Sequence, residues 1–286
     1  MVKPQARRAA VRHVQEAHGL SERRACGLIG IGRSSLRYEA RPKDDEELRE
    51  RLTELARKWR RAGYRSLYRH LRREGWEINH KRVYRVYREM ALQIRRRKRK
   101  RLKRPARGET PAPKSRNEVW AMDFVHDSLV DGRRVRALTI VDLCTRGTPW
   151  IEVATSIPGK PVVRVLDRLA EAHRLPQRII CDNGPEFLSF AMAVWAEERN
   201  VEIDYIESGK PVQNCFVESF NGTFRDECLN ENLFTSVGDA VRKVGTWWKS
   251  YNEERPHSSL GGLTPSEFAR ARPCGEPGST GQLACI

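Results

Sequence analysis

The order of apolar segments between residues 118 and 228 restricts the possible folds of this sequence more than any other feature. Three strand-type runs come first and are separated by short polar turns. Two further strand-type runs then alternate with amphipathic helical runs, and a last helical run follows. Because strands and helices repeat their apolar positions with different periods, this order favours a mixed sheet with helices on its faces.

The segments themselves specify the sheet further. The strand-type runs are EVWAMDFVHDSL, RVRALTIVDLC, WIEVATS, QRIICDNG and VEIDYIES, and the helical runs are PVVRVLDRLAEAHRL, FLSFAMAVWAEERN and VQNCFVESFNGTFRDECL. The Asp-Gly pair in VDGRR predicts a hairpin turn between the first two strands. We therefore expect an α/β core with a mixed five-stranded sheet and flanking helices. This is the element order of the ribonuclease H-like fold, in which the first and fourth strands are neighbours.

Positive charge is concentrated at the N-terminal end of the chain. The whole sequence has a formal net charge of +17, but residues 1–107 carry 34 Lys and Arg against 12 Asp and Glu, a net charge of +22, whereas the rest carries 20 against 25, a net charge of −5. The run RRRKRKRLKR at 95–104 is basic at nine of ten positions. Such a run repels itself and is ordered by phosphates. We therefore expect a polyanionic partner; a solvated linker is the alternative for the run alone.

Helical patterns fill this basic region. LSERRACGLIGIGRSSLRY predicts two short helices around a turn at Gly30 or Gly32, with Ser21 capping the first helix and Ser34 or Ser35 capping the second. This is the pattern of a helix-turn-helix, and an ordinary helical hairpin is the alternative.

A second helical unit follows. Its first helix carries an apolar stripe at steps of three and four, formed by Leu48, Leu52, Leu55 and Trp59. GYRSLYRHLRREGWEINHKRVYRVYREMAL then predicts a helix that ends near Gly75 and another that begins near Asn79. Both alternate apolar positions with Arg and Lys, so we expect the apolar side to pack and the basic side to face phosphates; a charged hairpin without a DNA role is the alternative.

Composition changes mark the expected domains. The segment KRPARGETPAPK has the Pro and Gly content of a linker. We expect a helical, basic DNA-binding region at 1–102, a linker at 103–114, a catalytic core with a C-terminal helix and an Arg-Pro-His element at 115–272, and a flexible tail at 273–286.

Cysteine use and hydropathy exclude several classes of protein. The seven Cys residues form no C-x-x-C pair and no zinc spacing with His, and no signal-peptide pattern precedes them. No window approaches the ~18 apolar residues of a membrane span. We therefore expect a reducing, cytoplasmic location and no membrane partner.

Two aspartates occupy positions that favour a metal site. Asp123 lies inside the apolar strand WAMDFV, where a lone carboxylate costs several kcal/mol unless a cation compensates it. Asp182, in CDNGPEF, follows the fourth strand, where open α/β sheets place their ligands. The alternative for Asp182 is a surface Asn-Gly turn. Since the first and fourth strands are expected to be neighbours, the two acids would converge at one edge.

A third acid has two candidates. Glu218 lies early in the helix VQNCFVESFNGTFRDE, and Arg225 follows seven residues later on the same face. Glu186 follows Asp182 closely but suits the start of the next helix, so we prefer Glu218 and keep Glu186 as second choice. Three oxygen ligands without His or thiolate suit Mg²⁺ or Mn²⁺, and two ions about 3.5–4 Å apart would support displacement at phosphorus. Capped turns and solvated acids are the alternative.

The combined motifs VWAMDF, CDNGPEF, GKPVQNCFVESFNGTFRDECL and YNEERPHSSLGGLTP resemble the DDE transposases of the IS-three insertion-sequence family, specifically the product of the second reading frame. Thirty-five residues separate the second Asp from the Glu, and the resemblance covers nearly the whole chain. It implies that Asp123, Asp182 and Glu218 form the catalytic triad and bind two Mg²⁺ or Mn²⁺ ions within an integrase-type core. Cys181 and Cys215 depart from the family pattern but remove no ligand.

The resemblance also implies a role for basic and aromatic residues near the triad. Arg225 stands where the family has a basic residue that touches the DNA end. His257, in the Arg-Pro-His element, approaches DNA or is a packed structural side chain. We further expect DNA contacts from a set of basic side chains: Lys210, Arg95, Arg96, Arg97, Lys98, Arg99, Lys100 and Arg101.

The implied activity is metal-dependent cleavage and strand transfer at insertion-sequence ends, leading to DNA integration in the bacterial cytoplasm at the nucleoid. The implied partners are double-stranded DNA at element ends and target, further copies of the chain on DNA, and the upstream frame product by binding or fusion. One alternative is a DNA-binding regulator or fusion half without catalysis of its own. Another is a structure-selective nuclease on the same core.

Overall fold

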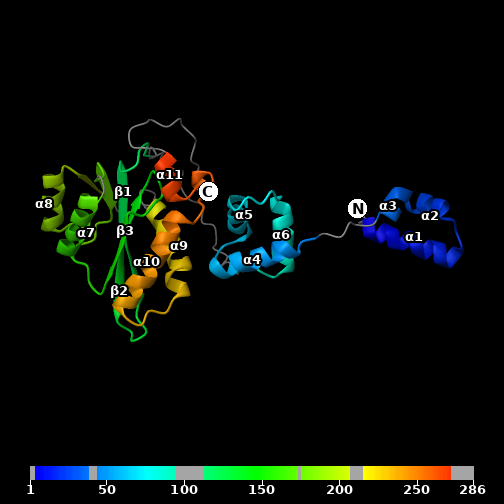
Figure 1. Ribbon diagram of the computed structural model, residues 1–286, viewed down its shortest axis with the longest axis horizontal. Coiled ribbons are helices and arrows are strands. Elements are labelled where there is room, and N and C mark those ends of the chain that lie inside the picture. Colours follow the sequence, from blue (N-terminus) through cyan, green and yellow to red (C-terminus); the bar gives the residue numbers. More distant parts are fainter. Residues whose placement is uncertain (1–3, 39–43, 95–112, 173–174, 207–214, 272–286) are drawn as a thin grey trace. The chain divides into compact units, whose positions relative to one another are not determined.

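The computed structural model describes residues 4–38, 44–94, 113–172, 175–206 and 215–271 (Figure 1). The chain divides into two compact units, Met1–Glu47 and Leu48–Ile286. The linker expected at 103–114 lies almost wholly outside the described residues, and so does the tail at 273–286. The domain boundaries inferred from composition therefore stay predictions.

The first unit is a small three-helix cluster. Helix α1 covers Pro4–His18, α2 covers Glu22–Ile29 and α3 covers Arg33–Arg37, and they enclose Val11, Ala25 and Cys26. The two short helices around a turn are confirmed. Gly30 ends α2 in a left-handed conformation with φ 68°, which glycine adopts without strain.

The expected caps of this turn were partly wrong. Ser21 occupies the N-cap position of α2, but its side chain makes no capping hydrogen bond. Gly32 is the N-cap of α3, so Ser34 and Ser35 lie inside that helix. The physical reason is that the chain has already turned at Gly30 and is extended at Gly32, which leaves the next residue free to begin the helix.

The second unit begins with three helices. These are α4 (Glu46–Lys58), α5 (Tyr64–Arg73) and α6 (His80–Glu89), and Asn79 caps α6 by accepting a 2.8 Å hydrogen bond from the main-chain N of Lys81. The expected stripe is confirmed, because its three leucines pack in one cluster with buried side chains of the other two helices: Leu67, Leu71, Val83, Val86 and Tyr87. None of the helices that the structure describes is long and apolar enough to cross a membrane.

The rest of the second unit is a five-stranded sheet with the order β3-β2-β1-β4-β5 (Figure 1). The strands are β1 (Val119–Ser128), β2 (Arg134–Asp142), β3 (Trp150–Ala154), β4 (Arg178–Cys181) and β5 (Glu202–Tyr205). The first three pair antiparallel, whereas β4 runs parallel to β1 and β5 parallel to β4. The predicted mixed sheet and the neighbouring first and fourth strands are both confirmed.

Helices cover both faces of this sheet (Figure 1). Helices α7 (Gly159–Ala172) and α8 (Phe190–Arg199) pack on one face against Trp120, Met122 and their neighbours. Helices α9 (Cys215–Glu227) and α10 (Val237–Glu253) pack on the other face against Val119, Ala121 and Val125. We call these the α7/α8 face and the α9 face. Because strand residues alternate between faces, Asp123 belongs to the α9 face.

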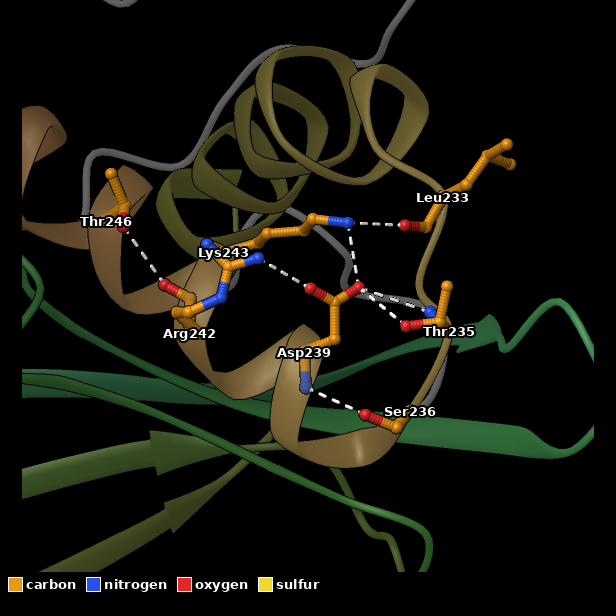
Figure 2. Close-up of polar contacts among 7 residues, drawn as sticks. All are labelled: Leu233, Thr235, Ser236, Asp239, Arg242, Lys243 and Thr246. Atoms are coloured by element: carbon orange, nitrogen blue, oxygen red, sulfur yellow. Dashed lines mark hydrogen bonds and ion pairs between the residues drawn. The ribbon is translucent and has the colours of Figure 1, made fainter.

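The start of α10 is fixed by a network of side-chain hydrogen bonds (Figure 2). Ser236 is the N-cap and accepts from the main-chain N of Asp239, and the Asp239 carboxylate accepts in return from the main-chain N and hydroxyl of Thr235. Lys243 donates to the Asp239 carboxylate and to the main-chain O of Leu233. These bonds, with that from Lys243 foremost, lower the pKa of Asp239. They anchor the segment that connects α9 to α10.

The remaining elements are short. Two single-turn helices cover Leu229–Glu231 and Ser258–Leu260, and α11 covers Pro265–Ala271. The first single-turn helix follows α9 directly. The second belongs to the loop that comes after α10 and contains the Arg-Pro-His element.

Candidate active site

The register of two parallel strands brings Asp123 and Asp182 together. Trp120 of β1 lies opposite Ile179 of β4, and Ala121 lies opposite Ile180. Two residues further along each strand direction are Asp123 and Asp182. Neighbouring strands lie about 4.8 Å apart and residues in register share a face, so both acids lie on the α9 face at the carboxyl end of β4.

Asp182 is both a turn residue and an exposed carboxylate. Its Oδ1 accepts a 3.0 Å hydrogen bond from the main-chain N of Gly184, and Asn183 Nδ2 donates to the main-chain O of Ile206 at 3.1 Å. The turn interpretation of CDNG is therefore correct. It does not exclude a metal site, because the turn holds the carboxylate beside Asp123.

Asp123 is partly buried and electrostatically disfavoured. Its Oδ1 accepts from the main-chain N of Phe124 and its Oδ2 accepts from Asn221 Nδ2, both at 2.8 Å. Burial raises the pKa of Asp123, and the negative charges of Asp182 and Glu218 raise it further, although these two hydrogen bonds act in the opposite direction. Since like charges act most strongly at short range, the three acids form one electrostatic cluster.

Glu218 reaches this cluster from α9. It is exposed and lies in the first turn of the helix, one turn before the Asn221 that bonds to Asp123. Residues three apart on a helix are neighbours on its surface. Glu218 therefore faces the same sheet edge as Asp123.

Glu186, the second choice for the third acid, is held elsewhere. It forms an ion pair with Arg136 of β2, and the Arg136 guanidinium also lies 4.1 Å from the centre of the Phe124 ring. Phe124 packs against the cluster of the α7/α8 face. Glu186 is thus paired with a protein cation, although its Oε2 lies near Asp182: a Cβ added at Gly184 would be 3.1 Å from Glu186 Oε2 and 3.0 Å from Asp182 Oδ1. Of the two candidates, only Glu218 contributes to raising the pKa of Asp123.

The three acids lie near one another, but their carboxylates are not arranged as ligands of a single metal ion. Among the residues that the structure describes, no three His, Cys, Asp or Glu side chains are placed so that they would hold a metal ion as they stand. The donor set nevertheless fits a divalent ion. It contains only carboxylate oxygens. Burial and like-charge repulsion make the ionised form of Asp123 unfavourable, and a bound cation would offset both effects. The neighbouring Cys181 side chain is fully buried in the apolar cluster of the α7/α8 face, and burial raises the pKa of its thiol to about 12.

The basic residues expected at DNA are only partly described. Arg225 is exposed on α9 and donates from Nη2 to the main-chain O of His126 at 2.8 Å. Lys210 and the run from Arg95 to Arg101 lie outside the described residues. Their DNA contacts stay predictions.

His257 is a packed side chain. It is 7% exposed, lies edge-on to Tyr251 with ring centres 4.9 Å apart, and has its pKa lowered by burial to about 3. Two residues before it, Arg255 bonds to Glu227 at 2.7 and 2.9 Å. The Arg-Pro-His element therefore ties the end of α9 to the loop after α10. Of the two interpretations of His257, the structural one is correct.

Sequence reasoning missed two residues at the cluster. Asn221 bonds to Asp123, and Thr139 of β2 donates to Asn221 Oδ1 at 2.9 Å. One signal was available for Asn221, because asparagine is a weak helix former and lies here in a helix interior three residues after Glu218. Thr139 gave no signal in an apolar strand.

Comparisons with known families match both helical and sheet regions. Residues 113–211 and 199–265 match two family models that are each described as "Integrase core domain", and residues 43–100 match one described as "HTH-like domain". The first two matches cover the sheet together with helices α7 to α10. The third covers α4 to α6. The shorter turn between α2 and α3 stays a predicted helix-turn-helix.

Similar proteins come from bacterial insertion elements. The chain is 48% identical over 257 residues to the "Insertion element IS407 uncharacterized 31.7 kDa protein" of Burkholderia multivorans, with 90% of this chain and 93% of that protein covered. It is 45% identical over 269 residues to the "Insertion element IS476 uncharacterized 39.2 kDa protein" of Xanthomonas euvesicatoria, with 93% and 77% covered.

A solved structure resembles the chain in fold. It is the cryo-EM structure of the simian T-cell lymphotropic virus intasome in complex with PP2A regulatory subunit B56 gamma, with a TM-score of 0.52 and 16% identity over 81% of this chain and 80% of that chain. At this identity the likeness concerns the fold alone.

Proposed function

The chain belongs to the transposases of the IS-three insertion-sequence family, and on this premise we propose that it cuts and joins DNA at the ends of its element through Asp123, Asp182 and Glu218. Integrase and transposase family members are polynucleotidyl transferases, which gives the reaction class. One observation supports the choice of residues: Asp182 directly follows β4 at the position that continues its register with Asp123 of β1, and α9 is hydrogen-bonded to Asp123 one turn after Glu218.

The three carboxylates would bind the metal ions from different elements of the fold. Asp123 and Asp182 would hold divalent cations from the sheet, and Glu218 would close the site from α9. Integrase-type cores use divalent metal ions, and we propose Mg²⁺ or Mn²⁺, two in number, at this oxygen-only set. When bound, such ions stabilise the attacking and leaving oxygens of an in-line displacement at phosphorus. No covalent intermediate on the protein is needed.

The basic side chains bind and orient DNA in this proposal. Arg225 lies seven residues after Glu218 on the same helix, so it would contact a phosphate near the cut. Lys210 and the run from Arg95 to Arg101 would neutralise the flanking phosphates. We also propose that several copies assemble on the DNA, that the chain can bind or be fused to the upstream frame product, and that it acts at the nucleoid in the bacterial cytoplasm.

Cleavage and joining of element-end DNA test the proposal. Asp123→Asn and Asp182→Asn are each expected to abolish both reactions in Mg²⁺ and to leave DNA affinity within about threefold, since binding rests on basic residues. Asp127→Asn, on the same strand four residues after Asp123, is the matched control and is expected to keep both reactions. Retained cleavage by either site variant would refute the triad.

Two other functions are separated by the same assay. The catalytically incomplete regulator is not favoured, because the chain matches the integrase core as well as the HTH-like model. A structure-selective nuclease would give only hydrolysed ends. Joined strands among the products distinguish the transposase from the nuclease.

A further inference from the structure

We propose that Asn221, held by Thr139, is a positioning residue that orients the Asp123 carboxylate and sets how α9 meets the sheet. This inference rests on the proposed function of Asp123 and Glu218. It concerns how the acids are arranged, not which acids they are.

A chain of hydrogen bonds connects three elements at this point. Asn221 Nδ2 of α9 donates to Asp123 Oδ2 of β1 at 2.8 Å. The Thr139 hydroxyl of β2 lies 2.9 Å from Asn221 Oδ1 and 3.0 Å from the main-chain O of Asp123. Thr139 is fully buried and lies directly opposite Asp123 in the antiparallel register. The position of Asn221 is therefore fixed from the sheet.

The partners also fix the orientation of the Asn221 amide. An ionised carboxylate only accepts hydrogen bonds, and the Thr139 hydroxyl is the group that can donate to the amide oxygen. Reversing the amide would set its oxygen against the Asp123 carboxylate oxygen, so that two groups that only accept hydrogen bonds would face each other. The donor thus points at Asp123.

Asn221 is not needed to dock α9 on the sheet. Val217, Phe220 and Phe224 already bury this helix face in the apolar cluster of the α9 face. Apolar packing is non-directional, so it leaves the helix free to slide or rotate slightly. The hydrogen bond to Asp123 removes that freedom one turn from Glu218. The Asn221 amide therefore fixes the position of Glu218 relative to Asp123.

The bond also limits rotation of the Asp123 carboxylate. The terminal torsion of an aspartate is broad, so a carboxylate without fixed donors samples many orientations. Here Phe124 N holds one oxygen and Asn221 holds the other. Each oxygen keeps a second lone-pair direction for a cation. Magnesium demands near-ideal ligand geometry, and loss of an outer hydrogen-bond partner typically costs about 10–100-fold in metal affinity or activity.

The test measures metal binding and catalysis on the full chain. Asn221→Ala is expected to weaken Mn²⁺ binding, followed by calorimetry without DNA, by about tenfold. It should raise the Mg²⁺ concentration for half-maximal cleavage by a similar factor and lower kcat, with the KM for DNA unchanged. Thr139→Val removes the hydroxyl at nearly constant shape and should act in the same direction, and Thr139→Ser should restore the wild-type behaviour.

Asn232→Ala is the matched control. Asn232 donates from Nδ2 to the main-chain O of Cys228 at 2.8 Å, so it also ties the end of α9 but has no contact with Asp123. It is expected to keep Mn²⁺ affinity. Wild-type Mn²⁺ affinity in folded Asn221→Ala, or equal losses in Asn221→Ala and Asn232→Ala, would overturn the inference.

Asp123→Asn separates this inference from the proposed function. Loss of Mn²⁺ binding and cleavage in Asp123→Asn, with both intact in Asn221→Ala, refutes the positioning role alone. Retention of both in Asp123→Asn refutes the proposed site itself.

Discussion

The acidic side chains on the two sides of the sheet differ in whether a basic side chain neutralises them. On the α7/α8 face, Glu186 is neutralised by Arg136. On the α9 face, no ion pair reaches Asp123, Asp182 or Glu218 from the Lys and Arg residues that the structure describes, and burial and mutual repulsion raise the pKa of Asp123. Asp182 and Glu186 are only four residues apart. Proximity in sequence is therefore a poor guide to the ligands of a metal site. An acid that forms no ion pair with a Lys or Arg side chain of the protein is the better candidate for a metal ligand.

The strongest way to break this comparison is to neutralise one acid on each face. Glu218→Gln is expected to lower cleavage of element-end DNA by about 10³-fold, because it removes a charge that would hold the catalytic ions. Glu186→Gln should change it by less than about tenfold. Single-turnover cleavage in Mg²⁺ measures both. A larger loss of cleavage in a folded Glu186→Gln variant than in Glu218→Gln would assign the third metal-ligand position to Glu186.

Removing the cation of the α7/α8 face should affect stability more than chemistry. Arg136→Met leaves Glu186 as a part-buried charge without its partner, so the free energy of unfolding should fall by about 1–2 kcal/mol. Urea denaturation measures the change. Adding Glu186→Gln should recover part of it, since the second change removes the charge that was left alone. If the two changes lower the free energy of unfolding additively in the double variant, the ion pair itself contributes nothing to stability.

Acid should weaken the α9 side of the molecule through His257. The ordinary pKa of His is about 6.5, whereas burial lowers the pKa of His257 to about 3. The folded state therefore binds fewer protons between these values, so this contribution to stability is complete above pH ~6.5 and is lost as the pH falls towards 3. We expect the free energy of unfolding to drop by about 1–2 kcal/mol from pH 7.5 to pH 5.

A variant resolves the part that His257 plays in this decline. His257→Phe should have a shallower decline with acid than the wild type. His70, whose pKa burial lowers to about 4, adds to the decline in both proteins. An equal decline in wild type and His257→Phe would exclude His257 as a source.

The smallest effect concerns Gly222, four residues after Glu218 on the exposed side of α9. Nothing lies within 4 Å of a Cβ added there, so Gly222→Ala should raise the free energy of unfolding by about 0.5–1 kcal/mol. If DNA approaches this face, the methyl group should slow cleavage severalfold despite the added stability. Gly245→Ala in α10 has equal room and is expected to gain stability without any loss. Identical activity in both variants would place the DNA elsewhere.

Much of the core follows from local patterns. The period of the apolar residues predicted all five strands, and the Asp-Gly pair predicted the first hairpin turn. The succession of strands and helices indicated the ribonuclease H-like fold, from which the pairing of the first and fourth strands was expected. Asp123 and Asp182 were identified because a carboxylate inside an apolar strand and one at the end of a strand are locally unusual. Ser34 and Ser35 were wrong as caps because the turn closed at Gly30, before the chain reached them.

The supporting residues could not be predicted in the same way. Asn221 bonds to a residue 98 positions earlier, and Thr139 bonds to one 82 positions later. Such contacts depend on strand register and on the rotation of α9, neither of which a local pattern contains. The sequence already favoured Glu218 over Glu186, but the ion pair of Glu186 with Arg136, which supports that preference, joins residues 50 positions apart and depends on the same long-range information.

The arrangement of the three acids is tested most directly by locating bound metal. Crystals of the chain in Mn²⁺, with anomalous diffraction recorded at the manganese edge, would show where the ions lie. Two peaks about 3.5–4 Å apart and in contact with Asp123, Asp182 and Glu218 are the predicted result. Manganese coordinated by Glu186 in place of Glu218, or a metal shell that excludes Glu218, would contradict it.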